Sequence, residues 1–374
     1  MKKMLFAAAV SVMLLGLTAC GASDKPASTE APKAQSGETA AQAETTGAET
    51  KENGEKPTLI VSNFALADDR IKESVIKPFE AKFNCTVIYE GGTNAERLTK
   101  LKNDPNSDVD VIYLSQQFAQ QGVDQGLFKE VDYTKIPNAA DLLSKAGIFA
   151  DSKQGPPNTM NRLAIIYNPE KAGTVTSFAD IWKPEYEGQV AIPDISTTFG
   201  PAMVAVASAY AGVDYTTDGG EAAFQALEQL KPNIVNTYTK SSDLKNMFEA
   251  GEISIALAAE FAYNTMGDSN VDLVFIDPTE GAYLNFNTIN IAKNTDQEDL
   301  AYEFINFILS KESQEEAAIG IPASAVNTKA VVPEEAAKKL TTIESAEKAN
   351  VLDYKYINDH LKEWIDMWNR TLNQ

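Results

Sequence analysis

The side chains that could perform covalent chemistry are few in this sequence. It has one histidine, His360, and two cysteines, Cys20 and Cys85. An enzyme needs a nucleophile with a base beside it, or a cluster of metal ligands, and the sequence has neither a Gly-x-Ser-x-Gly turn nor a metal-ligand cluster. We predict a protein that is not an enzyme and carries no metal or cofactor. Because the chain has 53 acidic residues, a carboxylate-pair hydrolase is the remaining enzymatic alternative.

Side chains suited to binding follow two predicted strands. Asn63 and Phe64 come directly after one strand, and Gln116, Gln117 and Phe118 come after another. Amides donate and accept hydrogen bonds, and aromatic faces can cover the apolar part of a solute. Ligands of open α/β sheets lie beyond the carboxyl ends of the strands, so these positions predict a binding rim. The alternative for the two phenylalanines is packing in a core.

The elements that must position these residues alternate along the chain. Strands are predicted over 58–62, 86–89 and 109–114 from their length and β-branched content. Between them, 69–83 repeats apolar residues every four positions, as one face of a helix does, and 96–102 is predicted as a short helix. This alternation predicts an α/β fold with a parallel sheet and helices on both faces.

A second block of the same kind follows. Its expected elements are strands at 164–168, 189–192, 252–257, 273–276 and 283–292 and helices at 201–210, 219–230 and 297–310. The stretch from Pro333 onward is expected to be mostly helical, with Trp364 and Trp368 as the buried stripe of the last helix. Residues 57–374 are numerous enough for two lobes.

The N-terminus has the features of an export signal. Lys2 and Lys3 precede an apolar run from Met4 to Leu17, which suits a signal peptide and is short of the ~20 residues that span a bilayer. The sequence Leu-Thr-Ala-Cys that ends at Cys20 resembles the lipobox of bacterial lipoproteins, which implies cleavage before Cys20 and a lipid on its sulfur. The alternative is an ordinary signal peptide with a chance cysteine near the cleavage site.

Composition separates a tether from the rest of the chain. Residues 21–56 contain no aromatic residue and no Val, Ile or Leu. Such a stretch cannot bury enough apolar surface to offset its ordering entropy, so we predict a disordered tether.

The net charge of −21 argues against a nucleic-acid partner. The charge also fits a cationic ligand, but the general acidity of secreted bacterial proteins explains it more simply.

Three motifs carry a resemblance to a known family. They are Phe178-Ala-Asp-Ile-Trp182-Lys-Pro-Glu-Tyr-Glu-Gly188, Gly251-Glu-Ile-Ser-Ile-Ala256, and Leu300 to Leu309 with the following Ser310-Lys-Glu-Ser-Gln-Glu. With them the chain resembles the extracellular solute-binding proteins of ABC importers, above all the spermidine/putrescine-binding branch. The resemblance covers essentially the whole mature chain. It implies the two-lobed type 2 periplasmic-binding-protein fold, in which each lobe is a mainly parallel sheet flanked by helices and the ligand cleft lies between the lobes.

The resemblance also implies a division of the chain. The expected parts are a signal peptide (1–19), a lipid-anchored tether (20–56), lobe 1 (57–162 with about 285–322) and lobe 2 (163–284 with about 323–374). Hinge segments are expected near 159–163 and 283–287, and closure of the lobes over the solute is a known kind of transition. The implied partner is an ABC permease with a cytoplasmic ATPase, and the implied protein is a monomer at the extracytoplasmic face of a bacterial membrane.

The family's ligand residues are only partly matched. Glu260 falls where the polyamine branch carries a cleft carboxylate, whereas Asn287 falls where the family carries an aspartate. Ala258 stands where an aromatic residue is usual, and Asp194 is the only acid where a pair is expected. The resemblance therefore implies a small amine or zwitterion, such as putrescine or spermidine. Thiamine, a phosphorylated or phosphonate solute and ferric iron are the alternatives.

A loop of the second lobe could hold the acidic end of such a solute. Thr197 and Thr198 precede the helix that begins near Pro201, and the free N–H groups of a helix N-terminus attract anions. With Glu260 across the cleft, this loop would suit a zwitterion, and plain helix capping is the alternative. Arg162 could reinforce the anionic end or pair with surface acids.

The remaining candidates are neutral. Phe199 could cover the solute or pack in a core, and Asn285 and Asn287 can form neutral hydrogen bonds to it. A function of another class also stays open at this point, since a lipoprotein sensor or adhesin could use the same fold.

Overall fold

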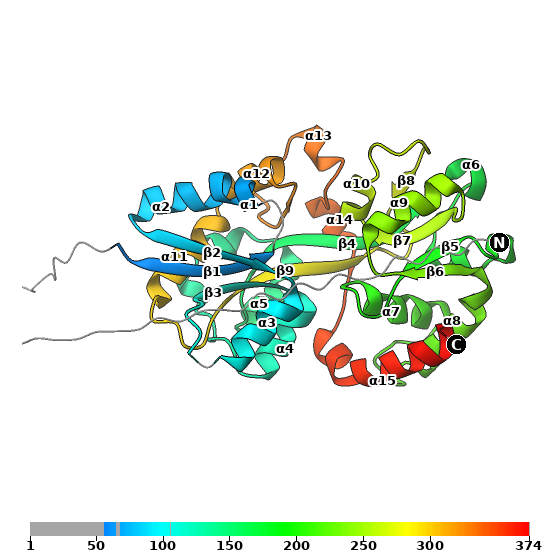
Figure 1. The fold of residues 1–374 in the computed structure, drawn as a ribbon, viewed down its shortest axis with the longest axis horizontal. Coiled ribbons are helices and arrows are strands. Elements are labelled where there is room, and N and C mark those ends of the chain that lie inside the picture. The colour runs from blue at the N-terminus through cyan, green and yellow to red at the C-terminus, as the bar shows by residue number, and fades with distance from the viewer. Residues whose placement is uncertain (1–55, 65–67, 105, 374) are drawn as a thin grey trace, which may run out of the picture. The chain divides into compact units, whose positions relative to one another are not determined.

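The computed structural model describes residues 56–64, 68–104 and 106–373, and the fold is given for these residues (Figure 1). The expected signal peptide, Cys20 and all but the last residue of the expected tether lie outside the described residues. None of the described helices is long and apolar enough to cross a membrane. The described residues belong to one compact unit, and within it two lobes share a sheet.

Three parallel strands form the first lobe's part of the sheet. β1 (Thr58–Phe64) lies between β2 (Thr86–Gly92) and β3 (Val111–Ser115). Leu59 and Val61 on one face of β1 are fully buried, and Ser62 on the other face is 3% exposed, as expected for a strand that is covered on both faces. The three strands predicted in this part of the sequence are confirmed, with ends that differ by a few residues.

Two long antiparallel strands connect the lobes. β4 (Pro157–Tyr167) pairs with β9 (Tyr283–Ile291) between Pro157 and Leu163, and β9 pairs on its other side with β3. The predicted hinge segments 159–163 and 283–287 fall in this paired stretch. The sheet has the order β2-β1-β3-β9-β4-β7-β5-β6.

The second lobe repeats the parallel arrangement. β5 (Val190–Pro193) lies between β6 (Ile234–Tyr238) and β7 (Ile255–Ala259). β7 is antiparallel to β4, and β8 (Val274–Ile276) also pairs with β4. The sequence analysis missed β6, because this strand ends the sheet and most of its side chains are exposed or half-buried.

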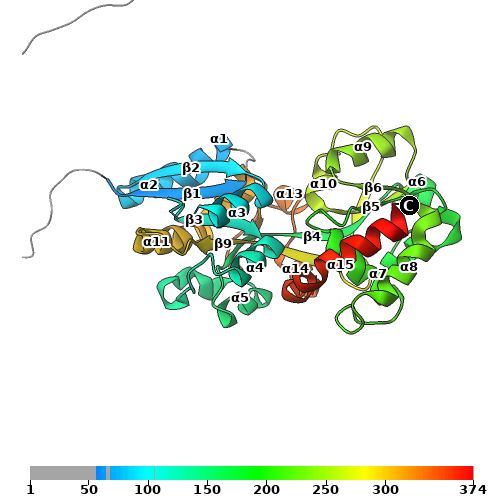
Figure 2. The ribbon, with the colours of Figure 1, turned by 60° about the horizontal axis from the view of Figure 1, so that its bottom comes forward.

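Helices cover both faces of the sheet in each lobe (Figures 1 and 2). Those of the first lobe are α1 (Asp68–Ile71), α2 (Lys77–Phe83), α3 (Asn94–Asn103), α4 (Gln116–Asp124), α5 (Gly147–Asp151), α11 (Glu298–Ile308) and α12 (Lys311–Gly320). Those of the second lobe are α6 (Pro169–Ala172), α7 (Gly200–Tyr210), α8 (Glu221–Leu230), α9 (Ser241–Ala250), α10 (Glu260–Asn264) and α15 (Tyr354–Leu372). Mixed layers of this kind confirm the predicted α/β fold class.

The helix predicted over 69–83 forms with an interruption. A π-helical turn, Lys72–Ile76, separates α1 from α2, and such turns insert an extra residue into a helix. Phe79 is fully buried and packs edge to face on Phe304, with 5.0 Å between ring centroids. Helix α4 was not predicted, because Gln116–Asp124 is rich in glutamine and has few apolar residues.

Each lobe has its own apolar core. In the first lobe Leu59, Phe286 and Phe304 belong to one cluster, and in the second Trp364 and Trp368 belong to another. Both tryptophans are fully buried, which confirms the predicted stripe of the last helix. Complete burial of a large apolar side chain stabilises a fold by ~2–3 kcal/mol.

The C-terminal segment departs from the predicted division. We expected 323–374 to belong to lobe 2, but Val326 and Ala346 pack into the core of lobe 1. This part contains β10 (Ser324–Ala325), which pairs with β4, as well as α13 (Glu334–Ala337), α14 (Ile343–Lys348) and β11 (Asn350–Val351). The chain joins the core of lobe 2 only from Leu352 onward. Elements this short carry no apolar periodicity, so the sequence could not show which lobe they cover.

Gly155 allows the chain entering β4 to approach β9 closely. A Cβ atom at this position would lie 1.9 Å from the carbonyl oxygen of Ile289, so the backbone would have to move. We expect Gly155→Ala to lower the free energy of unfolding by ~2 kcal/mol, as overpacking does, in chemical denaturation. Gly147→Ala, whose Cβ would meet nothing within 4 Å, is the control. Equal destabilisation by both variants would contradict this account.

Candidate functional site

The candidate site lies where β1 and β3 end beside the crossing strands. Asn63 and Phe64 end β1, and Gln116 begins α4 directly after β3. Ser115, the last residue of β3, stands opposite Asn287 of β9 in the register. Predicted site residues from three distant segments are therefore brought to one edge of the sheet.

A row of uncharged polar side chains runs along the crossing strands. Asn287 Nδ2 donates to Thr159 Oγ1 at 3.0 Å, and Asn285 Nδ2 donates to Asn161 Oδ1 at 3.1 Å. Because alternate residues of a strand share a face, and the register pairs Thr159 with Asn287 and Asn161 with Asn285, the four lie on one face. We call these four residues the amide ladder.

Four polar atoms in and beside the amide ladder are buried without a hydrogen-bond partner among the described residues. They are Ser115 Oγ, Gln116 Oε1, Asn158 Oδ1 and Asn285 Oδ1. A buried polar atom left unpaired costs ~1–3 kcal/mol, and in native proteins such an atom requires an explanation. Three of the four are carbonyl oxygens, which only accept hydrogen bonds. The group therefore suits a solute that donates them, such as an amine.

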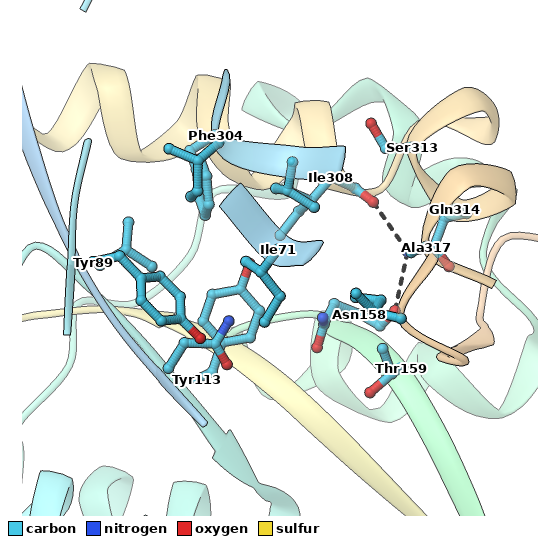
Figure 3. A pocket seen from close by; sticks show the side chains of 15 residues that line it. Ile71, Tyr89, Tyr113, Asn158, Thr159, Phe304, Ile308, Ser313, Gln314 and Ala317 are labelled. Carbon is cyan, nitrogen blue, oxygen red and sulfur yellow. Dashed lines mark hydrogen bonds between the residues drawn. The ribbon is translucent and has the colours of Figure 1, made fainter. Parts of the chain in front are cut away.

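A pocket of the first lobe opens beside the amide ladder (Figure 3). Asn63, Asn158 and Thr159 form part of its polar wall. Gln314 Nε2 fixes this wall by donating to the backbone oxygen of Asn158 at 3.0 Å. The apolar wall comes from the segment of the π-helical turn and from α11 and α12, and consists of Ile71, Val75, Ile76, Phe304, Ile308, Ala317 and Ile321. An aliphatic group beside an amine would find apolar contacts here.

A second cavity lies between the lobes, where α4 and α15 begin. Gln116, Gln120 and Phe149 line it from the first lobe, and residues 352–355 line it from the segment that enters α15. Tyr354 lines this cavity and also packs in the core of lobe 2, and its buried hydroxyl too lacks a hydrogen-bond partner in the described part of the chain. Burial raises the pKa of the Tyr354 hydroxyl far above its usual value, so this group keeps its proton and remains a hydrogen-bond donor.

A buried cation stands behind the ends of β1 and β3. Arg97 of α3 donates to the backbone oxygens of Gly92 at 3.0 Å and Ser62 at 3.3 Å and to that of Tyr113. Its guanidinium also lies over the ring of Phe64, 4.6 Å from the centroid. These acceptors are neutral, and burial lowers the pKa of Arg97 to about 10, so it remains charged at neutral pH.

Asn94 links this cation to the site. Its Oδ1 accepts from Arg97 Nη2 at 3.3 Å and from the backbone N–H of Ser115 at 3.0 Å. The positive charge therefore lies close to the end of β3, where it favours an anionic group on a bound solute.

Glu260, the carboxylate expected in the cleft, is used by the protein itself. Its Oε2 accepts from the backbone N–H of Arg162 at 2.9 Å, and its Oε1 accepts from Thr341 Oγ1 at 2.7 Å and from Ser324 Oγ at 3.4 Å. Burial is the main influence on its carboxyl group and raises the pKa of Glu260. The side chain is therefore a buried tie between α10, β4 and the C-terminal segment, and the expected contact of Glu260 with an ammonium group stays a prediction.

Arg162 also has protein partners. Its Nε pairs with Asp277, and its Nη1 donates to Thr341 Oγ1 at 3.1 Å. The guanidinium lies over the ring of Phe275, 4.8 Å from the centroid. Of the two alternatives for Arg162, the structure supports pairing with an acid and not contact with an anionic solute.

The Thr197–Thr198 loop forms an internal turn. Thr197 Oγ1 donates to the backbone oxygen of Asp194 at 2.8 Å, while Asp194 Oδ1 accepts from the backbone N–H and the hydroxyl of Ser196. The N-cap of α7 is Phe199, which makes no side-chain capping bond. The alternative for this loop, plain capping of α7 by a threonine, is therefore not observed, and Thr198 stays an untested candidate for solute contact.

The three phenylalanines expected around the solute are separated. Phe199 is 5% exposed and packs in the core of lobe 2, which is the alternative given for it in the sequence analysis. Phe118 packs beside Leu98 and Leu101 in a satellite cluster of lobe 1. Phe64 is half-buried at the end of β1 and stays a candidate.

Gln117 contributes its backbone, since its carbonyl oxygen accepts from Asn358 Nδ2 at 3.0 Å. Sequence reasoning missed Thr159 and Asn161 of the amide ladder, although polar residues at alternate positions of two predicted crossing segments were a usable signal. Tyr354 gave no signal in the sequence, because it belongs to the first turn of an ordinary amphipathic helix.

Among the described residues, no group of three His, Cys, Asp or Glu side chains is placed to hold a metal ion.

Two lobes joined by crossing strands, with a polar site at the strand ends, define a type 2 periplasmic-binding-protein fold. The model of the family described as bacterial extracellular solute-binding protein matches residues 74–343, and the chain belongs to this family.

Known relatives agree with this assignment. A crystal structure of an ABC transporter from Clostridium perfringens is 47% identical, covers 84% of this chain and all of that one, and superposes with a TM-score of 0.82. The spermidine/putrescine-binding periplasmic protein 1 of Haemophilus influenzae is 27% identical over 72% of this chain and 74% of its own length. The gamma-aminobutyric acid-binding protein of Pseudomonas aeruginosa is 25% identical over 83% of this chain and 90% of its own length.

Proposed function

We propose that this chain is the solute-binding component of an ABC importer, and that it takes a small amine or zwitterion between its lobes. The observation that carries the proposal is a group of buried acceptors that have no hydrogen-bond partner among the described residues, Ser115 Oγ, Gln116 Oε1 and Asn285 Oδ1, beside the two crossing strands. An amine would satisfy these atoms, and contacts from both lobes would favour a closed arrangement. Delivery to a permease and its ATPase follows from the family.

The charges favour a solute with one amine and one acidic end. A buried ammonium group needs nearby acceptors, which the amide ladder supplies, but Glu260 is already occupied by protein donors. Arg97 places a positive charge behind β3, linked to Ser115 through Asn94, and this charge would attract a carboxylate. The name of the Pseudomonas relative, a binder of gamma-aminobutyric acid, supports this choice.

A polyamine is the second candidate for the solute. The name of the Haemophilus relative supports it, and so does the acidity of the chain, which carries a net charge of −21. Apolar side chains of the first-lobe pocket, such as Ile71 and Ile308, would contact methylene groups. Neutral acceptors at the ladder would hold one ammonium group.

The N-terminal sequence supports attachment to the membrane by lipid at Cys20, through its resemblance to a lipobox. The acylated chain would stand on the extracytoplasmic face of the cell membrane as a monomer, tethered by residues 21–56. Growth with labelled palmitate tests this part, because the wild-type chain should carry label and Cys20→Ser should not.

A thermal-shift panel tests the solute class. The full chain is heated with gamma-aminobutyrate, putrescine, spermidine, thiamine, an aminophosphonate and a ferric salt. A solute at 100 times its dissociation constant adds ~2.7 kcal/mol of stability, so we expect a shift of a few degrees with gamma-aminobutyrate or a close homologue. A shift with spermidine alone would favour the polyamine candidate, and no shift with any amine would contradict the proposal.

A further inference from the structure

Helices α4 and α15 come from different lobes and lie side by side (Figure 2). Asn358 of α15 uses both ends of its amide in this contact. Its Nδ2 donates to the backbone oxygen of Gln117 at 3.0 Å, and its Oδ1 accepts from Gln121 Nε2 at 3.3 Å. Because α4 follows β3 in lobe 1, and α15 is anchored in the core of lobe 2 by Trp364 and Trp368, these two bonds tie the lobes together.

Helix geometry relates this tie to the interlobe cavity. Gln117 and Gln121 are four residues apart, as are Tyr354 and Asn358, so each pair lies on one face of its helix. Tyr354 therefore lies one turn before Asn358 on α15, where it also packs in the core of lobe 2. Gln116 and Tyr354, the first residues of the two helices, both line the cavity between the lobes.

Both of these cavity residues have unused hydrogen-bonding capacity. Gln116 is 7% exposed and Tyr354 is 3% exposed. Neither Gln116 Oε1 nor the Tyr354 hydroxyl has a partner among the residues that the structure describes. One is an acceptor from lobe 1, and the other is a donor from the helix that enters lobe 2. A solute with an amine and an acidic end could bond to both only while the two helices stay together.

We propose that Asn358 is a positioning residue, which fastens α15 to α4 so that Tyr354 and Gln116 face the same solute. The proposal rests on the proposed function, namely that the solute binds between the lobes. Asn358 does not touch the solute in this account. It raises the fraction of molecules whose lobes are arranged for binding, and apparent affinity scales with that fraction. The tie consists of uncharged amides, so salt does not screen it.

The distance between the lobes tests the tie without any solute. Spin labels on Lys102→Cys of lobe 1 and Lys240→Cys of lobe 2, both exposed, report this distance by double electron–electron resonance. The full chain would also carry Cys20→Ser, and Cys85 is buried. We expect Asn358→Ala to give a broader distribution with a longer mean distance than the wild type. An unchanged distribution would overturn the proposal.

Asn369→Ala is the matched control. Asn369 is an exposed residue near the other end of α15, and its Oδ1 accepts from Asn373. Its removal should leave the distance distribution as in the wild type. If Asn369→Ala widened the distribution as much as Asn358→Ala does, the effect would belong to α15 as a whole and the proposal would fail.

Solute affinity gives the second readout. Asn358→Ala removes two neutral hydrogen bonds between the helices, each worth about 1 kcal/mol. We therefore expect this variant to bind gamma-aminobutyrate or putrescine about tenfold more weakly, mainly through faster dissociation. Unchanged affinity would overturn the link between the tie and the solute. A wild-type chain that binds neither amine would contradict the proposed function instead, and the distance measurement would still decide the role of Asn358.

Discussion

Asn285→Leu should weaken binding of the amine solute by about 10- to 100-fold, because a hydrogen bond to a charged group is worth ~1.5–3 kcal/mol. Asn285 is fully buried in β9, and its Oδ1 has no partner among the described residues. Leucine has a similar volume and cannot accept a hydrogen bond. Isothermal titration calorimetry with the amine that gives the largest thermal shift measures the effect.

The same substitution should leave the unfolding free energy nearly unchanged. It removes the bond from Asn285 Nδ2 to Asn161, but it also removes a buried oxygen whose lack of a partner destabilises the solute-free protein. Lost affinity with retained stability is the mark of a binding residue. Asn236→Leu, on the outermost strand of lobe 2, is the control and should bind as the wild type does. Equal affinities of Asn285→Leu and the wild type would remove Asn285 from the site.

Glu260→Ala should lower the free energy of unfolding by ~3 kcal/mol, the scale for removing one member of a buried, hydrogen-bonded charge network. The carboxylate accepts from the Arg162 backbone and from Thr341, and alanine would leave both donors unpaired in the interior. Urea denaturation measures the loss. Glu316→Ala, at an exposed residue of α12, is the control and should cost far less. Weak solute binding by Glu260→Ala without any loss of stability would restore the cleft role expected from the sequence.

The pH dependence of stability tests the same carboxyl group. Burial raises the pKa of Glu260 in the folded chain, so between its unfolded and folded pKa values the folded state binds more protons than the unfolded state. Stability contributed by Glu260 is therefore fully present below the unfolded pKa of about 4.3 and is lost as pH rises through the folded pKa. The wild type should lose stability relative to Glu260→Gln as pH rises from 4. A constant difference between the two would contradict a raised pKa.

Much of the fold could be predicted from the sequence because its strands and longer helices carry strong local patterns. Ile71, Val75 and Phe79 repeat at helical spacing, and the helix forms there even though a π-helical turn interrupts it. The crossing of β4 and β9 was expected from the family motifs. Strand β6 and helix α4 were missed because their composition is mostly polar.

The site was harder to predict because its chemistry depends on which hydrogen bonds the protein makes internally. Glu260 was the leading candidate in the sequence, as the carboxylate expected in the cleft, and Asn285 was one of several neutral candidates. The structure shows that the Glu260 carboxylate accepts hydrogen bonds from protein donors, whereas the buried Oδ1 of Asn285 has no partner in the part of the chain that the structure describes. Whether a buried polar group finds a hydrogen-bond partner depends on residues that are distant in the sequence, and no local sequence pattern encodes it.

The most direct test of the account is a crystal structure of the chain with the amine that stabilises it most. We predict that the amine nitrogen lies between the lobes, within ~3 Å of Asn285 Oδ1 or Gln116 Oε1, the acceptors that lack partners in the described part of the chain. A solute bound outside the interlobe region, or held by the Glu260 carboxylate while Asn285 Oδ1 stays unpaired, would contradict it.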